Sequence, residues 1–168
     1  MMIRPARLRD AAGIAALHTA SWRSAYQGVL PAWRLGSTLD NDRQRHWRTM
    51  LARARSRDVV LVSDDGKQLL GFIAVWVGSG QAYIDNLHIQ PTLRGQGIGE
   101  QLMRAAARRL VRIGYRQADL WAFVANTAAL RFYARLGGMM DRRGFDRFLR
   151  TQAPCQRVVW RRLDRLAR

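Results

Sequence analysis

The sequence predicts a single α/β or α+β domain in which helices flank a mixed, mostly antiparallel central sheet. Three observations lead to this prediction. Strand-like alternation with turn residues fills positions 59–89, a glycine-rich segment at 94–99 joins a strand to a helix, and helical periodicity flanks this region. The chain has 168 residues, of which 48% are hydrophobic, and shows no repeat or linker. We therefore expect one domain over residues 1–168.

The N-terminal third is expected to hold a strand and two helices. Residues 2–8 form a short apolar and polar stretch that suits a strand, and Asp10 is expected to cap the first helix. Apolar residues then recur at helical spacing over 14–22, and a second helical pattern runs from about residue 40 to 55.

The middle of the chain predicts an antiparallel meander. Residues 59–62 and 69–77 form a hairpin around the turn Asp64–Lys67, and a third strand is expected over 82–89. That strand has a phase defect, because Ile84 and Leu87 are three residues apart, whereas residues on one face of a strand are separated by even numbers. We expect a β-bulge near Asp85 and Asn86.

The C-terminal half predicts a helix, a strand and a second helix. The first helix starts at Ile98 and ends near Gly114, and a strand is expected over Ala118–Val124. Asn126 is expected to cap the next helix, which stops at 137–138. A last strand is expected over Arg157–Leu163, and no element is assigned to 139–154.

The net charge of +17 raises the question of nucleic-acid binding. Lys67 is the only lysine, and the arginines are scattered from Arg4 to Arg168 instead of forming one block. This distribution favours a solvated basic surface over a dedicated nucleic-acid face. The charge would still attract polyanionic ligands.

The composition also disfavours an internal disulfide, a metal site and a membrane location. The single cysteine, Cys155, cannot form an internal disulfide, and His18, His46 and His88 have no metal-ligand spacing, so we expect no metal site. No apolar run approaches the ~20 residues that span a bilayer, and residues 1–7 lack the apolar core of a signal peptide. We expect a cytoplasmic protein with no membrane partner.

The segment 87–100 predicts an anion site. A strand leads through glycines directly into a helix, so unpaired backbone N–H groups and the positive end of the helix dipole converge. No Gly-Lys-Ser/Thr sequence exists for a Walker loop, and Glu100 stands where a dinucleotide fingerprint requires glycine. The remaining pattern is Arg-x-x-Gly-x-Gly from Arg94 to Gly99.

This pattern resembles the acetyl-CoA-binding motif of the GNAT superfamily of N-acetyltransferases. The resemblance also includes the bulged strand before the loop and an Asn and a Tyr seven residues apart, Asn126 and Tyr133. It implies the GNAT acyl-CoA N-acyltransferase fold and acetyl-CoA as cosubstrate. It departs at Gly138, where the family commonly has an aromatic residue, and this leaves the packing of the following strand open. The cofactor-binding residues implied are Leu87, His88, Ile89, Arg94, Gly95, Gln96, Gly97, Ile98, Gly99 and Asn126.

The resemblance also implies a direct acetyl transfer to a primary amine in a ternary complex. Tyr133 would be the general acid that protonates the departing thiolate, since a tyrosine is protonated at neutral pH. A backbone N–H near Leu87 or His88 would stabilise the oxyanion. Asp85 is the first candidate for the base and His88 the second. On spacing alone, a core role is the favoured interpretation of Tyr133, and only the resemblance reverses this; Asp85 and His88 are also compatible with structural roles.

The acceptor site implied by the resemblance lies between the N-terminal helices and the end of the sheet. Trp22, Tyr26 and Trp33 are the candidate substrate-binding residues. An aromatic site could hold a cationic amine, whereas the abundant arginine argues for an acceptor with a carboxylate or phosphate. The acceptor, a small molecule or a peptide, is left open, and a homodimer is an assembly often found in the family. The alternatives are a basic nucleic-acid-binding module and a GNAT-fold protein that binds acyl-CoA without catalysis.

Overall fold

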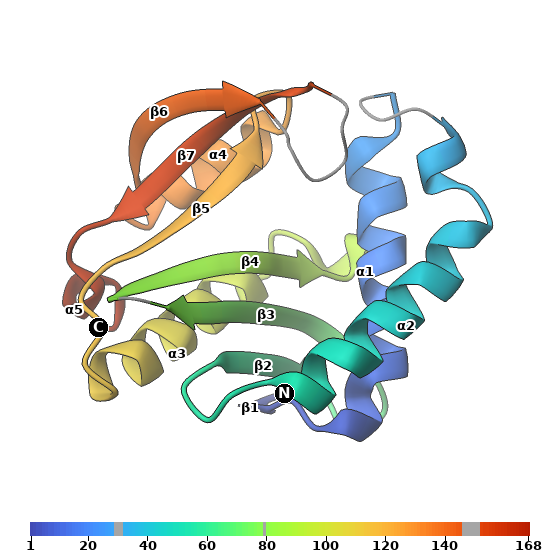
Figure 1. The fold of residues 1–168 in the computed structure, drawn as a ribbon, viewed down its shortest axis with the longest axis horizontal. Coiled ribbons are helices and arrows are strands. Elements are labelled where there is room, and N and C mark those ends of the chain that lie inside the picture. Colours follow the sequence, from blue (N-terminus) through green and yellow to red (C-terminus); the bar gives the residue numbers. More distant parts are fainter. Residues whose placement is uncertain (29–31, 79, 146–151) are drawn as a thin grey trace.

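A seven-stranded sheet forms the centre of the computed structural model, which describes residues 1–28, 32–78, 80–145 and 152–168. The strand order is β1-β2-β3-β4-β5-β7-β6 (Figure 1). All neighbouring strands are antiparallel except β4 and β5. The strands are β1 (Met2–Pro5), β2 (Val59–Asp64), β3 (Leu69–Gly78), β4 (Gln81–Ile89), β5 (Ala118–Phe123), β6 (Met139–Phe145) and β7 (Pro154–Trp160).

Helices cover both faces of this sheet. They are α1 (Ala11–Tyr26), α2 (Thr38–Arg53), α3 (Ile98–Arg112), α4 (Thr127–Arg135) and the short α5 (Leu163–Leu166), with 3-10 turns η1 (Leu8–Asp10), η2 (Ala32–Leu35) and η3 (Pro91–Leu93). The stripe Ile98, Leu102, Ala106 and Leu110 of α3 is buried on one face of β2–β4, as its spacing predicts. On the opposite face, Ile14 of α1 and Trp47 of α2 pack on Phe72 of β3. The predicted mixed sheet flanked by helices is confirmed.

The feature that positions the site is the divergence of β4 from β5. The two strands pair at Ala82–Ala118 and Tyr83–Asp119 only, and the ladder stops there. Figure 1 shows the strands separating from that point, with β5 continuing beside β7. Along the rest of β4, the edge that faces β5 carries no strand partner within the described chain.

The predicted bulge is present in β4. The register with β3 shifts between Ala74 and Val75, which face Asn86 and Ile84, so Asp85 is the extra residue. The bulge lets Ile84 and Leu87 face the same core despite their spacing of three.

The C-terminal strands differ from the sequence prediction. The last strand begins at Pro154 and ends at Trp160, not at Leu163, which opens α5 and is buried. The unassigned segment contains β6, which pairs with β7 at the sheet edge. Six of the seven β6 residues are exposed, so no alternation of buried and exposed residues marks this strand in the sequence.

Gly138 is explained by the neighbouring side chains. A Cβ at this position would lie 2.6 Å from Val158 Cγ1 and 2.8 Å from Trp160 Cζ2. The Trp160 ring therefore occupies the space that an aromatic residue at 138 would need, and its indole N–H donates to the Leu136 carbonyl at 2.9 Å.

Asp10 occupies the N-cap position of α1, as predicted, but its side chain makes no capping hydrogen bond to that helix. Its carboxylate accepts two hydrogen bonds from Arg4 and one from the Arg7 backbone N–H. Arg4 also binds Asp64, so this network fastens β1 to β2 and to the start of α1. None of the helices in the described residues combines the length and apolar character needed to cross a membrane.

Candidate active site

The turn from β4 into α3 presents backbone N–H groups. Gly95 and Gly97 adopt φ angles of +81° and +79°, which L-residues with a side chain rarely adopt. Within the described chain, the amides of residues 95–97 make no backbone hydrogen bond, and the first N–H groups of α3 have no partner inside the helix. The helix dipole adds positive potential at the same place. The turn is suited to holding a phosphate or pyrophosphate.

The Arg94 side chain reaches the neighbouring helix instead of this turn. Its guanidinium donates to the hydroxyls of Ser24 (3.0 Å) and Ser21 (3.2 Å), and to the Ser21 carbonyl (3.3 Å). These bonds fasten the glycine turn to the C-terminal half of α1. Arg94 therefore positions the turn in this structure, and its assignment to direct cofactor binding stays a prediction.

The open edge of β4 adds the second element of a cofactor site. Leu87 and Ile89 pack into the α3 side of the core, so only their backbone groups are available at the edge. A linear amide chain could pair with those groups as an added strand would. Such a chain would pass from the glycine turn at the end of β4 back to the bulge at Asp85.

Tyr133, on α4, is largely buried in the core cluster that also contains Ile84 of β4. It is 9% exposed, and its ring packs edge-on against Trp160, with 5.8 Å between ring centroids. Burial raises the pKa of its hydroxyl well above the ordinary value, and the nearby Tyr26 adds to the shift. The hydroxyl makes no hydrogen bond within the described residues. It is therefore a protonated donor that is free to bind a ligand.

Asn126 caps α4 as predicted. Its side-chain oxygen accepts the Ala129 backbone N–H at 3.1 Å. Burial raises the pKa of Tyr26, and the Asn126 side chain opposes this effect. The role that the structure gives to Asn126 is the cap of α4, and direct cofactor contact stays a prediction.

Asp85 presents its carboxylate on the face of the sheet that α1 and α2 cover. The carboxylate accepts the Trp76 indole N–H at 2.9 Å and the Asn86 amide at 2.6 Å. Both donors come from the sheet, so they fix the carboxylate with respect to β4. A fixed carboxylate at the bulge can accept a proton from a bound ammonium group.

His88 is poorly suited to the role of base. Its Nδ1 lies 2.9 Å from the Ser21 hydroxyl, and its ring stacks on His18 with 4.4 Å between centroids. Burial is the main cause that lowers the pKa of His88 to about 3, and Arg94 and Arg43 add to the shift. An imidazole with so low a pKa is a weak proton acceptor. The His88 side chain instead packs β4 against α1.

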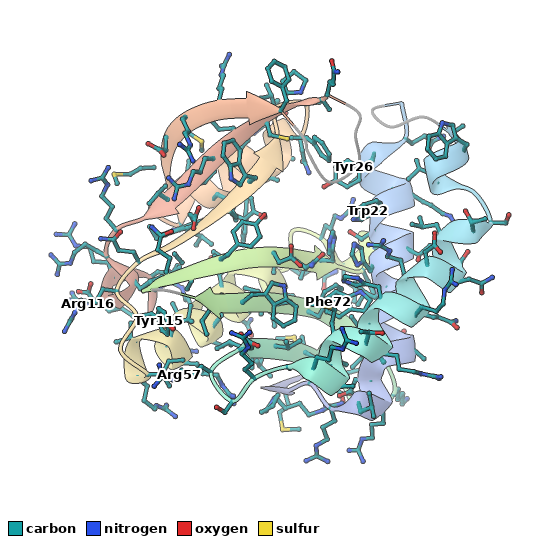
Figure 2. The ribbon with its side chains drawn as sticks, viewed as in Figure 1. Trp22, Tyr26, Arg57, Phe72, Tyr115 and Arg116 are labelled. Carbon is teal, nitrogen blue, oxygen red and sulfur yellow. The ribbon has the colours of Figure 1, made fainter. Side chains whose placement is uncertain are left out.

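The predicted acceptor residues separate into two groups. Trp22 and Tyr26 lie one turn apart on α1, on the side that faces β5 and β7 (Figure 2), and Tyr26 packs edge-on against Phe123 at 5.1 Å. Trp33 is 68% exposed and belongs to none of the three buried clusters. Its role in substrate binding has no support from this packing.

Residues on α2 and the sheet that the sequence analysis did not select complete this face. Arg43 lies over the Trp22 ring, with its guanidinium carbon 5.2 Å from the ring centroid. Tyr83 lies near Asp85, and burial, followed by the Asp85 charge, raises its pKa to about 12. No signal in the sequence distinguishes Arg43 from the chain's other arginines. Tyr83, two residues before the bulge, could have been selected by its place on β4.

The buried histidines predict a loss of stability at mildly acidic pH. Burial lowers the pKa values of His18 and His88 in the folded protein. Below about pH 6.5 these histidines therefore become protonated in the unfolded chain while they stay neutral in the folded chain. Stability should fall by up to ~1.4 kcal/mol per pH unit for each histidine between pH 6.5 and 4.5. Urea unfolding at several pH values measures this slope. His88→Gln should flatten it, and the half-buried His46→Gln should flatten it less.

The same pH experiment separates histidines from carboxylates. Arg4 holds the pKa of Asp10 below the ordinary value of 3.8, and the Gly66 backbone N–H, followed by Arg4, does the same for Asp64. The stability that these carboxylates contribute is therefore lost only below that pH. A slope between pH 6.5 and 4.5 that is identical in the wild type and in His88→Gln would contradict the role given to His88.

Among the residues that the structure describes, no group of three or more His, Cys, Asp or Glu side chains could hold a metal ion.

A glycine turn at a helix N-terminus, beside a bulged strand with one open edge, defines the class of acyl-CoA-binding α/β folds. The chain matches the acetyltransferase (GNAT) family over residues 16–138. This protein belongs to the GNAT family of acetyltransferases.

Individual proteins that the chain is similar to in sequence are also named as N-acetyltransferases. The chain is 32% identical over 90 residues to an uncharacterised N-acetyltransferase of Methanocaldococcus jannaschii, a match of 49% of this chain and 40% of that protein. It is also 32% identical over 78 residues to a Bacillus subtilis protein named as a ribosomal protein bS18-alanine N-acetyltransferase, covering 46% and 51% of the two chains. These matches thus span about half or less of the relatives.

Solved structures extend the likeness to nearly the whole chain. The PaiA N-acetyltransferase of Thermoplasma acidophilum, determined in complex with coenzyme A, superposes with a TM-score of 0.80 at 18% identity. The superposition covers 93% of this chain and 96% of that one. At this identity the likeness concerns the fold.

Proposed function

We propose that the protein is an acetyl-CoA-dependent N-acetyltransferase that transfers an acetyl group directly to a primary amine. The observation that carries the proposal is the continuity of the glycine turn with the open edge of β4, in a chain of the GNAT family. The pyrophosphate would bind the N–H groups of residues 95–99 and the start of α3. The pantetheine arm would lie along β4, and the acetyl group would reach the bulge.

The proposed transfer uses three groups of this chain. Asp85 takes a proton from the acceptor ammonium, and the neutral amine nitrogen attacks the thioester carbonyl. A backbone N–H near Leu87 or His88 donates to the developing oxyanion. The C–S bond breaks as the C–N bond forms, and Tyr133 gives its proton to the leaving thiolate. As the tetrahedral intermediate collapses, the nitrogen loses its second proton, which restores the Tyr133 hydroxyl through solvent, and Asp85 releases the first proton to solvent. The products are an N-acetyl amine, CoA with its thiol protonated, and one proton in solution.

The acceptor is proposed only as an amine of a small molecule or a peptide. A relative is named as an enzyme for a ribosomal protein alanine, which supports a peptide acceptor for that protein. A homodimer and a cytoplasmic location stay predictions.

Thermal unfolding with and without acetyl-CoA tests the proposal first. A ligand at ~100 times its Kd adds about 2.7 kcal/mol of stability, which corresponds to a shift of several degrees in a chain of this length. The shift should survive added salt. A shift seen only with heparin or duplex DNA, and lost as salt rises, would favour the alternative of a nucleic-acid-binding module.

Substitutions at glycines test whether the turn between β4 and α3 binds CoA. We expect Gly97→Val to raise the Kd for CoA at least tenfold, because a branched side chain resists a φ of +79° and fills the approach to the N–H groups. Gly66→Val is the matched control, since Gly66 has a φ of +90°, open surroundings and a place in the distant β2–β3 turn. Isothermal titration should show normal CoA affinity in Gly66→Val. Equal affinities in the two variants would refute the assigned turn.

A cluster of arginines is the feature that would favour the alternative of a nucleic-acid-binding module. Nitrogen-bearing side chains surround the molecule in Figure 2, but five arginines gather at a hollow of about 340 Å³. These five are Arg104, Arg135, Arg161, Arg162 and Arg165. Arg104 and Arg162 already pair with Glu100 and Asp164. The remaining charge is a small patch, and it lies on α4, on the residue after β7 and on α5, outside the proposed active site.

A further inference from the structure

Arg43 carries an unsatisfied buried donor on the acceptor side of the molecule. Its Nε is buried without a hydrogen-bond partner, and its guanidinium makes no ion pair within the described residues. The contact that fixes it is the cation–π contact with Trp22. Burial lowers the pKa of Arg43, and the charges of Asp42 and Asp85 oppose this effect. A partly desolvated cation without a counter-charge is costly unless a ligand supplies one.

The nearby carboxylates do not supply that counter-charge. Asp42, the sequence neighbour of Arg43, forms an ion pair with Arg45 at 2.7 Å. Asp85 is held by Trp76 and Asn86 and forms no ion pair with Arg43. Asp85 nevertheless lies on the same side of the sheet as Arg43, because its partner Trp76 packs against the cluster formed with α1 and α2. The Asp85 charge also acts on the pKa of Arg43.

Arg43, over Trp22, and Asp85, bonded to Trp76, therefore present opposite charges on the face of the sheet that α1 and α2 cover. Asp85 suits an ammonium group, and the planar fork of Arg43 suits a carboxylate. The aromatic side chains that contact the two charged groups are Trp22 at Arg43 and Trp76 at Asp85, and both suit an apolar or aromatic part of a ligand. This arrangement matches a zwitterion and leaves a simple amine or polyamine without a counter-charge for Arg43.

We propose that the acceptor is a small aminocarboxylate of the amino-acid class, whose carboxylate binds Arg43 while its amino group lies at Asp85. This inference rests on the proposed function, since it names the acceptor of the same transfer. Arg43 is then a residue that determines specificity, and it takes no part in proton transfer.

The test compares matched acceptors. The twenty standard L-amino acids, spermidine and a short peptide are first assayed for acetylation with acetyl-CoA. The best amino acid is then compared with its carboxamide and its decarboxylated amine, which keep the amine and side chain but lose the carboxylate charge. We expect kcat/KM for the acid to exceed that for either neutral analogue at least tenfold.

Variants of α2 assign that preference to Arg43. Arg43→Gln should lower kcat/KM for the acid at least tenfold and change that for the carboxamide less than twofold. Arg48→Gln is the matched control, because it removes the same charge from an exposed position of the same helix. Arg43→Lys should restore part of the preference, since it keeps the charge without the planar fork. If Arg43→Gln does not fold, the preference of the wild type for the acid over its carboxamide decides whether the acceptor is an aminocarboxylate.

The outcomes separate the two proposals. Acetylation of spermidine or the peptide with no preference for free amino acids would overturn the inference and leave the proposed function intact. A preference that survives in Arg43→Gln would overturn the assignment to Arg43. Failure to acetylate any amine, despite bound acetyl-CoA, would overturn the proposed function and with it the inference.

Discussion

Tyr133→Phe should lower kcat by about 10²-fold or more, the range that general acid catalysis contributes, and leave the Kd for CoA nearly unchanged. The substitution keeps the ring that packs on Trp160 and Phe132 and removes only the hydroxyl. Because burial and Tyr26 raise the pKa of this hydroxyl, it stays protonated over the whole working range of the enzyme. Steady-state kinetics with CoA binding by calorimetry measures both quantities.

Tyr115→Phe is the matched control for this variant. Tyr115 also packs against the α3 core, and it lies at the opposite end of the molecule from Tyr26 (Figure 2). It should keep full turnover. Normal turnover in Tyr133→Phe would remove Tyr133 from the role of acid. If Tyr26→Phe then lost turnover, the acid would be Tyr26, whose hydroxyl lies in the same neighbourhood.

Asp85→Asn should lower kcat/KM for the amine by about 10²-fold or more at pH 7. The amide can still accept the Trp76 indole N–H, so the bulge is expected to keep its conformation. The deficit should shrink as pH rises towards the pKa of the acceptor amine, because more of the amine is then neutral without a base. A pH series of kcat/KM for wild type and variant checks this.

A structural role for Asp85 would give a different result. Lost positioning would lower activity by the same factor at every pH, and it would also lower the melting temperature. Asp42→Asn serves as the control for charge, since it removes a carboxylate from the exposed face of α2. That variant should keep both the activity and its pH dependence.

The bulge and the glycine turn could be predicted because each depends on residues close together in the chain. A spacing of three between Ile84 and Leu87 requires an extra residue in the strand, and Gly95 and Gly97 supply the positive φ angles that the turn uses. The Asn126 cap has the same local origin. Asp10 stands at the predicted N-cap of α1, but its carboxylate binds Arg4, six residues earlier, and makes no capping bond to the helix.

The sequence by itself determined the mixed sheet, the turn into α3 and the family of the protein, since periodicity and turn chemistry act over a few residues. Only the tertiary structure decided how distant groups meet. The exposed strand β6 is defined by its pairing with β7, and the low pKa of His88 arises mainly from burial against α1 and β3. Arg43 differs from other arginines only because α2 brings it over Trp22 and near Asp85. These contacts join residues far apart in the chain, and no local spacing records them.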